Sequence, residues 1–243
     1  MSRFFVPIEA IKGKLITISG NEAHHIIDVM RLRLSDKVVT FDGTGKEYIG
    51  VIKEVSRNSL VVEIAQTREA QKKEVAGITL LQALPKKDKM DYIVEKATEL
   101  GVRSIKPIIT ERTIPDWNES KKKSQADRWR KIALEAAKQC GRLDIPQVAA
   151  IASFTDAVKG FTGLDLKLIA ILNEEAVPVK EAIKDFKSGN VVISIGPEGD
   201  FSPNEAKIAK EFGFKAISLG PRVLKSDTAG LALISILNYE FTS

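Results

Sequence analysis

The chain has 243 residues, 44% of them hydrophobic and 28% charged, and this length and composition suit one large or two modest globular domains. The sequence contains no apolar run long enough for a membrane span. One cysteine, Cys140, excludes an internal disulfide and a cysteine-rich zinc site, and two adjacent histidines offer too few ligands for a metal centre. We therefore expect a cytoplasmic protein with no metal and no membrane partner. The net charge of +5 is concentrated in residues 71–142, where 17 basic and 10 acidic side chains give +7, as in a nucleic-acid-binding face or a solvated helix.

Residues 1–66 are predicted to form short strands joined by turns. Strands are expected at 37–41, 47–55 and 60–64. In residues 22–31 the apolar side chains recur at helical spacing, which predicts one helix. Short strands at such intervals indicate a compact barrel or sandwich. The polar stretch 66–74 has no hydrophobic period and is predicted to be a linker.

After the linker, strands and helices alternate. Buried strands are expected at 78–84, 167–172, 191–195 and 216–219, and helices at 89–100, 125–139, 203–212 and 228–239. Asp88 is expected to cap the first helix, and Gly101 to end it. Ser202, Pro203 and Glu205 form a capping-box pattern before another. This alternation is typical of a parallel sheet with helices on both faces.

Two loops near the C-terminus carry the strongest local signals. Gly196-Pro197-Glu198-Gly199 follows one buried strand, and a second Gly-Pro loop beginning at Gly220 follows another. Parallel sheets bind ligands at the carboxyl ends of their strands, and glycine lets the backbone approach a ligand closely. One such loop alone is also typical of a plain turn. Two of them, expected to close adjacent strands, indicate one pocket, and the absence of a G-x-G-x-x-G or P-loop motif argues against a dinucleotide or phosphate cradle.

The segments GPEGDFSPNE and LGPRVLKSDTA resemble the ribosomal RNA small subunit methyltransferase E family. That family belongs to the SPOUT, or trefoil-knot, superfamily and methylates N3 of a uridine in small-subunit rRNA. The resemblance continues through RFFV, NEAHHIIDVMRLRLSDKV, FDGTGKEY, QALPKKDKMDYIVEKATELGV and RWRKIALEAAKQCGRLDIP. The chain departs from the family pattern at Asp200, where glycine is usual, at Lys225 and Asp227, where arginine and glutamate are usual, and at Cys140, where serine is usual.

The resemblance implies an α/β fold with a SPOUT-type, trefoil-knot parallel sheet over residues 71–243 and an N-terminal PUA-like β-barrel domain over residues 1–70 that binds RNA. It implies S-adenosylmethionine as the cofactor, held mostly by backbone groups. The residues expected to bind it are Leu172, Ile195, Gly196, Pro197, Glu198, Gly199, Leu219, Gly220, Leu224, Thr228 and Ala229. It also implies a homodimer; the apolar C-terminal helix is expected either in the subunit contact or in the core of its own chain.

Methylation at uracil N3 requires that the N3 proton be removed or weakened. Glu198 and Asp227 are the acidic candidates, and Arg142 and Arg222, with Lys225, are cations that could stabilise a uracil anion or clamp a phosphate. Simpler roles stay open, because Arg142 could pair with a helix-end carbonyl and Asp227 could cap the last helix. The expected RNA-binding residues are Arg3, His25, Arg31, Arg33, Lys86 and Lys87. Of His24 and His25, one is expected to pack and the other to face RNA.

Two other functions remain open on the sequence. The chain could be a ribosome assembly factor that binds RNA without catalysis, although Gly196, Gly199 and Gly220 argue for a working cofactor pocket. It could also methylate transfer RNA, as relatives of the fold do, although the N-terminal domain and the EKATELG and QCGR motifs favour small-subunit rRNA as the partner.

Overall fold

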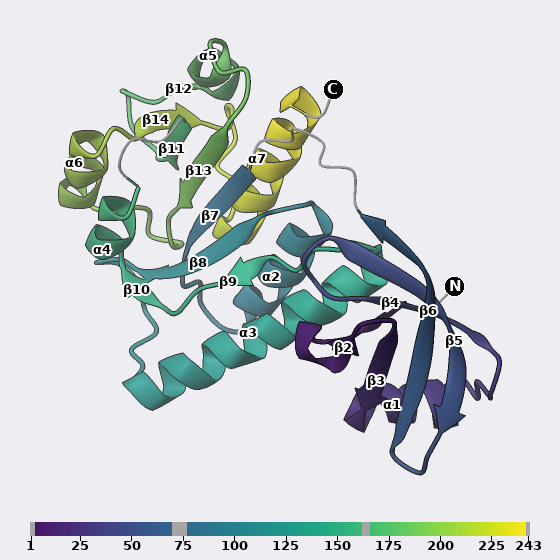
Figure 1. Ribbon diagram of the computed structural model, residues 1–243. Coiled ribbons are helices and arrows are strands. Elements are labelled where there is room, and N and C mark those ends of the chain that lie inside the picture. The colour runs from purple at the N-terminus through teal and green to yellow at the C-terminus, as the bar shows by residue number, and fades with distance from the viewer. Residues whose placement is uncertain (1–2, 70–76, 162–165, 242–243) are drawn as a thin grey trace. The chain divides into compact units, whose positions relative to one another are not determined.

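The computed structural model describes residues 3–69, 77–161 and 166–241 (Figure 1). The chain divides into two compact units. Unit 1 comprises Met1–Lys72 and Ala137–Ile145, and unit 2 comprises Lys73–Ala136 and Pro146–Ser243. This division assigns the segment 137–145 to the N-terminal unit, whereas the sequence offers only a single boundary near residue 70.

Unit 1 is built on a six-stranded sheet in the order β1-β4-β5-β6-β3-β2, with β1 parallel to β4 and the other pairs antiparallel. The strands are β1 (Arg3–Phe5), β2 (Ile11–Lys12), β3 (Leu15–Ser19), β4 (Lys37–Phe41), β5 (Lys46–Val55) and β6 (Ser59–Glu69). Ile16, Ile52 and Val62 are among the side chains that fill its core. The linker prediction is wrong for residues 66–69, which belong to β6, and its residues 70–74 lie outside the described part of the chain.

The helix predicted at 22–31 is shorter and less regular than expected. A 3₁₀ turn, η1 (Ile8–Ala10), precedes it, and α1 (Gly20–His24) continues directly into the π-helical segment η2 (His25–Val29). Ala23 and Ile26 point into the core of unit 1, as the helical spacing predicted. Arg31 adopts a φ of 56°, in the left-handed region, so the helix cannot continue through it.

Unit 2 contains a parallel sheet in the order β10-β8-β7-β13-β11-β14-β12, with β9 paired to β8. The strands are β7 (Gly77–Ala83), β8 (Ser104–Ile109), β9 (Gln147–Val148), β10 (Ala152–Ser153), β11 (Leu166–Ala170), β12 (Val177–Pro178), β13 (Asn190–Ile195) and β14 (Lys215–Ser218). Every pair in this sheet is parallel, which confirms the predicted α/β architecture. The knotted path implied by the resemblance stays a prediction.

Helices cover both faces of this sheet. They are α2 (Lys89–Glu99), α3 (Glu119–Cys140), α4 (Phe154–Lys159), α5 (Val179–Ile183), α6 (Pro203–Glu211) and α7 (Ser226–Phe241). In Figure 1, α4 and α6 lie on one side of β13 and α7 on the other. The capping box of Ser202 and Glu205 is confirmed, whereas the side chain of Asp88, at the N-cap of α2, makes no capping hydrogen bond.

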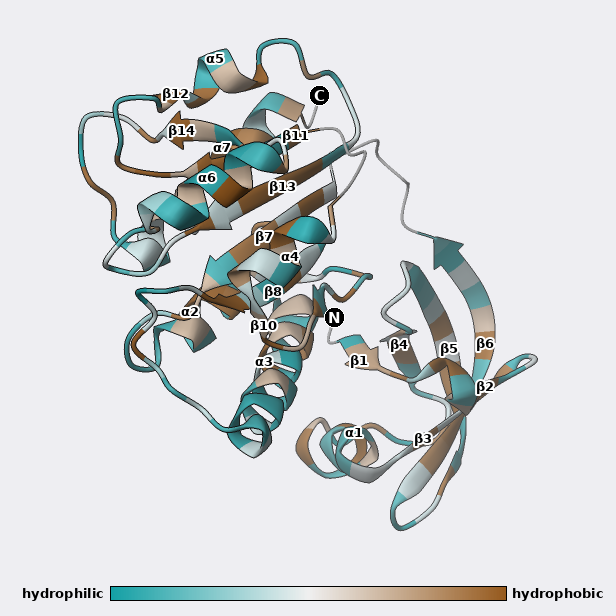
Figure 2. Cartoon of the chain, turned by 90° about the vertical axis from the view of Figure 1, so that its left-hand side faces the viewer, coloured by the Kyte–Doolittle hydropathy of each residue, from teal (hydrophilic) through white to brown (hydrophobic). Residues whose placement is uncertain are grey.

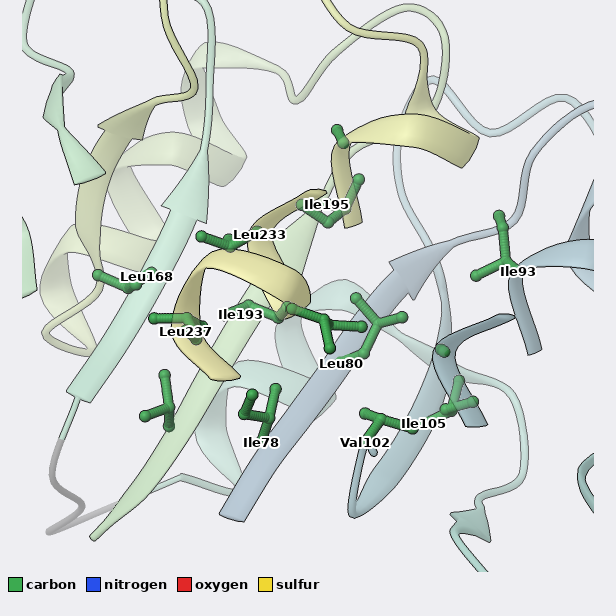
Figure 3. Close-up of a cluster of buried hydrophobic side chains, with 14 of the residues drawn as sticks. Ile78, Leu80, Ile93, Val102, Ile105, Leu168, Ile193, Ile195, Leu233 and Leu237 are labelled. Atoms are coloured by element: carbon green, nitrogen blue, oxygen red, sulfur yellow. The ribbon is translucent and has the colours of Figure 1, made fainter. Parts of the chain in front are cut away.

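The core between the sheet and α7 explains the apolar strands. β7 and β13 are brown along most of their length in Figure 2, because both faces of these strands are buried. Figure 3 shows Leu80 and Ile193 of the sheet next to Leu233 and Leu237 of α7. Gly230 lets the helix lie close, since a Cβ there would be 3.3 Å from the Gln82 side-chain oxygen. The carboxyl end of the sheet and the start of α7 are thereby held together.

Candidate active site

A pocket lies where β11, β13 and β14 end. Their ends lie within one residue of one another, because Ala170 at the end of β11 pairs with Ile195 at the end of β13 and with Ile217, the residue before the end of β14. The lining residues are Ala170, Ile171, Leu172, Ile195, Gly196, Pro197, Glu198, Asp200, Ile217, Ser218, Leu219, Gly220, Arg222, Val223, Leu224, Lys225, Ser226 and Ala229. The two Gly-Pro loops therefore meet in one pocket, but they do not close adjacent strands, since β11 lies between β13 and β14.

Most of the residues expected to bind the cofactor line this pocket. Those that line the pocket are Leu172, Ile195, Gly196, Pro197, Glu198, Leu219, Gly220, Leu224 and Ala229. Gly199 and Thr228 do not, because Gly199 lies against Arg112 and Thr228 is exposed at the start of α7. The sequence missed several lining residues at the ends of β11 and β14, and only the register of these strands would have revealed them.

The loop glycines act in different ways. Gly220 has a φ of 111°, where any side chain would strain the backbone, although a Cβ would meet no atom within 4 Å. Gly196 has no such φ, and a Cβ there would approach the Phe201 ring at 3.2 Å. A side chain at Gly196 would therefore crowd the Phe201 ring of the protein's own core as well as any ligand in the pocket.

Ser226 fixes the first loop from the start of α7. Its hydroxyl donates to the Gly196 carbonyl at 2.6 Å and accepts from the Gln82 side-chain amide at 3.0 Å. Gln82 is fully buried and Ser226 nearly so, with exposed fractions of 0% and 7%. A buried chain of hydrogen bonds thus joins β7, the β13 loop and α7.

Lys89, which the sequence did not single out, connects two candidate acids. Its ammonium nitrogen lies 3.4 Å from Glu198 Oε1 and 3.6 Å from Asp227 Oδ2. The Glu198 carboxylate also accepts from the Lys86 backbone N–H at 3.1 and 3.3 Å. Asp227 Oδ1 is buried and has no hydrogen-bond partner in the described residues. Glu198 is thus engaged on both oxygens, whereas Oδ1 of Asp227 is buried, has no partner among the described residues and does not belong to the pocket lining.

The loop after β8 supports the β13 loop from outside. Arg112 donates from Nη1 to the carbonyl oxygens of Gly199 at 2.7 Å and Phe201 at 3.3 Å. Hydrogen bonds from Ser202 and Asn204 hold the pKa of Glu111 below its ordinary value. These contacts fix the backbone between the pocket and α6.

Arg142, expected to be catalytic, belongs to unit 1. Its side chain is 13% exposed and pairs with the Asp144 carboxylate at 2.6 and 3.3 Å. The segment around Asp144 bonds to the β4–β5 turn, with Ile145 N–H donating to the Gly43 carbonyl at 3.1 Å. Pairing with Asp144 is a role that the sequence did not suggest, and the catalytic role stays a prediction.

Four of the six expected RNA-binding side chains are exposed: Arg31, Arg33, Lys86 and Lys87. Arg3 is engaged within unit 1, because it donates to Glu47 at 2.8 Å and to the Gly141 carbonyl at 3.0 Å. His25 packs edge-on against the Phe4 ring, with 5.6 Å between centroids. His24 is the exposed histidine and bonds Asp28 at 2.7 Å, so the expected orientations of the two histidines are reversed.

Neither a metal cluster nor a membrane span occurs in residues 3–69, 77–161 and 166–241. No group of three or more histidine, cysteine, aspartate or glutamate side chains there is arranged to hold a metal ion. No helix in these ranges has the length and apolar character required to cross a membrane.

Known proteins share both the fold and the pocket-bearing segment. Residues 71–238 match the family of RNA methyltransferase domains, and residues 18–65 match the family of RNA methyltransferase PUA domains. The Ribosomal RNA small subunit methyltransferase E of Aquifex aeolicus is 32% identical over 94% of this chain and 96% of its own. That of Bacillus subtilis is 27% identical over 99% of this chain and 97% of its own.

Solved structures agree. The same enzyme from Neisseria gonorrhoeae, bound to S-adenosyl methionine, is 30% identical, with a TM-score of 0.85 over 99% of this chain and 98% of that one. A methyltransferase from Legionella pneumophila, in complex with SAM, is also 30% identical, with a TM-score of 0.85 over 98% and 97%. Fold and site thus define an RNA methyltransferase with a PUA domain. More specifically, the chain belongs to the ribosomal RNA small subunit methyltransferase E family.

Proposed function

We propose that this protein transfers the methyl group of S-adenosylmethionine to N3 of a uridine in small-subunit ribosomal RNA. The observation that carries the proposal is the pocket in which two Gly-Pro loops meet at the carboxyl end of a parallel sheet. Family membership and the S-adenosyl methionine bound by the Neisseria gonorrhoeae relative support it.

The pocket's own residues fit this cofactor. Its wall is mostly apolar side chains and backbone, with charged groups only at Glu198, Asp200, Arg222 and Lys225. Such a wall suits a nucleoside, which needs apolar contact and a few well-placed polar groups. Oδ1 of Asp227, next to the Glu198–Lys89 pair but outside the pocket lining, is a buried acceptor that lacks a donor in the described residues, and a uracil offers an N–H donor.

The protein must make a protonated ring nitrogen nucleophilic. When bound, S-adenosylmethionine supplies an activated methyl group, so the chain has to align the uracil and take its N3 proton. A positioned base contributes about 10²–10⁴-fold. We assign this role to Asp227 rather than Glu198, because both oxygens of Glu198 accept hydrogen bonds, whereas Asp227 Oδ1 has no partner among the described residues. Arg222, which is exposed and lines the pocket, is the cation that we assign to stabilising a uracil anion.

The remaining expectations form part of the same proposal. Exposed Arg31 and Arg33 of unit 1 bind the rRNA backbone, and the protein works on the ribosomal subunit in the cytoplasm. It acts as a homodimer, which would cover exposed apolar side chains of α7 such as Ile236 and Tyr239, whose exposed fractions are 38% and 85%.

Methyl transfer assays distinguish this proposal from its rivals. Purified protein is incubated with labelled S-adenosylmethionine and unmodified small subunits, deproteinised rRNA or transfer RNA, and the product nucleoside is identified by mass spectrometry. We expect 3-methyluridine in small-subunit rRNA. Label in transfer RNA would favour a transfer RNA methyltransferase, and RNA binding without methyl transfer would favour a non-catalytic assembly factor.

A further inference from the structure

Asp200 joins two walls of the pocket through its carboxylate. Oδ2 accepts from the backbone N–H of Leu172, just beyond β11, at 3.0 Å. Oδ1 accepts from the N–H of Phe201, in the loop after β13, at 2.8 Å. Both Asp200 and Leu172 line the pocket, so a single side chain ties together loops that follow neighbouring strands.

The backbone at Asp200 has the conformation of a glycine. Its φ is 61°, in the left-handed region, and its N–H donates to the Pro197 carbonyl at 3.0 Å, which closes the turn. A glycine would adopt this φ without strain but would have no oxygen to offer Leu172. Aspartate tolerates the region better than most side chains, because its short polar group bonds locally. An aspartate at this position therefore adds a connection that a glycine would lack.

The chain after β11 depends on this connection. β11 ends at Ala170, and the N–H of Ile171 still reaches the Ile217 carbonyl at 3.3 Å. Leu172 is the next residue, and the Asp200 carboxylate accepts its N–H. Its own side chain is 66% exposed and provides no anchor in the core. Among the described residues, Asp200 thus provides the hydrogen-bond acceptor for the Leu172 N–H.

We propose that Asp200 is a positioning residue for cofactor binding. It holds Leu172 in place, so that this wall of the pocket is formed before the cofactor arrives, and less ordering is required on binding. The inference rests on the proposed function. Loss of the carboxylate should leave the fold intact, weaken cofactor binding and raise the dissociation rate, because the bound ligand must then order Leu172 itself.

Three variants test this role. Asp200→Gly suits the backbone and removes the carboxylate, Asp200→Asn keeps one acceptor oxygen, and Glu174→Gln removes an exposed charge from the same β11 loop. The dissociation constant of S-adenosylhomocysteine is measured by calorimetry, and hydrogen exchange is followed in residues 171–176. We expect Asp200→Gly to bind about tenfold more weakly and to exchange faster there. Asp200→Asn should be intermediate, and Glu174→Gln should match the unchanged protein.

Two results would overturn the inference. If Asp200→Gly binds as tightly as the unchanged protein, with the same exchange in residues 171–176, Asp200 does not position the wall. If the unchanged protein gives no binding at all, the proposed function fails together with this inference. Calorimetry of the unchanged protein therefore distinguishes the two failures.

Discussion

The hydroxyl group of Ser226, at the start of α7, donates a hydrogen bond to the backbone carbonyl of Gly196, with 2.6 Å between the oxygens. Gln82 donates to the same hydroxyl from β7. Because all three residues are buried, this short chain of hydrogen bonds holds the first Gly-Pro loop against the helix that follows the second one. The shape of the pocket thus depends on a residue pair 30 positions apart in sequence.

Ser226→Ala should destabilise unit 2 and weaken cofactor binding several-fold. The variant leaves the Gly196 carbonyl buried without its donor, which costs about 1–3 kcal/mol. Urea unfolding followed by the fluorescence of Trp117 and Trp129, both in unit 2, measures the loss. Ser235→Ala is the control, because Ser235 is exposed and bonds only within α7. Equal effects of the two substitutions would remove Ser226 from this role.

Gly220→Val should weaken cofactor binding by about ten- to a hundredfold. The φ of 111° at Gly220 strains any side chain by about 1–3 kcal/mol, and each 1.4 kcal/mol is about tenfold in affinity. Gly213→Val is the matched control, because Gly213 has a φ of 79° but lies in the α6–β14 turn and does not line the pocket. Calorimetric titration with S-adenosylhomocysteine should show the weaker affinity for the Gly220 variant and near-normal affinity for the Gly213 variant. Normal affinity in Gly220→Val would contradict the backbone argument.

Arg222→Ala and Asp227→Asn should keep cofactor affinity within a few-fold and lose most of their turnover. Interactions made with the reacting base contribute in the transition state, so their loss lowers the rate of methyl transfer without a matching loss of binding. Cofactor titration alongside single-turnover methylation of small subunits separates the two quantities. If either variant loses the cofactor instead, its side chain belongs to the cofactor site.

Charge reversal at Arg31 and Arg33 should weaken RNA binding and leave cofactor affinity unchanged. Both side chains are exposed in unit 1, and removing one arginine–phosphate ion pair should lower the slope of log affinity against log salt by about one. Arg57→Glu, also exposed in unit 1, is the control. Filter binding of small-subunit rRNA at several salt concentrations provides the slopes. Equal losses of affinity for Arg57→Glu would point to a general charge effect.

Asp42→Asn should reduce the acid sensitivity of unit 1. Burial alone would raise the pKa of Asp42, but hydrogen bonds from Thr44 and Tyr48 outweigh burial and lower that pKa. The pKa of Tyr48 is raised to about 12 by burial and by its hydrogen bond to Asp42. A lowered pKa in the folded state stabilises unit 1 above the ordinary value of about 4, and this contribution is lost as the pH falls through the folded pKa.

Thermal unfolding followed by circular dichroism between pH 6 and pH 3 tests this linkage. The unchanged protein should lose stability steeply toward pH 3, and Asp42→Asn should start lower and lose less. Glu54→Gln, an exposed change in β5, should follow the unchanged protein. Parallel curves for Asp42→Asn and the unchanged protein would contradict the assigned hydrogen bonds.

Local signals predicted most of the secondary structure. The apolar run of β13 and the capping box of α6 depend on neighbouring residues, so both could be predicted from the sequence. Elements with weaker patterns were missed, such as the first strands of unit 1 and the short α4 and α5. The linker was placed too early because polar side chains on an exposed strand, as in β6, have the same composition as a loop.

The sequence predicts those site residues that lie together in one segment of the chain, but not those that other segments contribute. The loop glycines lie within two residues of a strand end, so the sequence indicates them, whereas Lys89 reaches Glu198 from the start of α2 and Arg112 reaches Gly199 from the loop after β8. The insertion of β11 between β13 and β14 follows from long-range strand pairing, which no local pattern encodes. Likewise, the sequence identified Asp200 as unusual, but only the position of Leu172 shows what its carboxylate holds.

The proposed methyl transfer is tested most directly by mapping methyl groups on ribosomal RNA in cells. Small-subunit rRNA is isolated from a strain that lacks this protein, from the same strain complemented with the unchanged gene, and from one complemented with Arg222→Ala, and the fragments are analysed by mass spectrometry. We predict that one uridine lacks an N3 methyl group in the deletion strain, regains it with the unchanged gene, and stays largely unmethylated with Arg222→Ala. Identical small-subunit rRNA in all three strains, or a methyl group missing from transfer RNA instead, would contradict the proposed function.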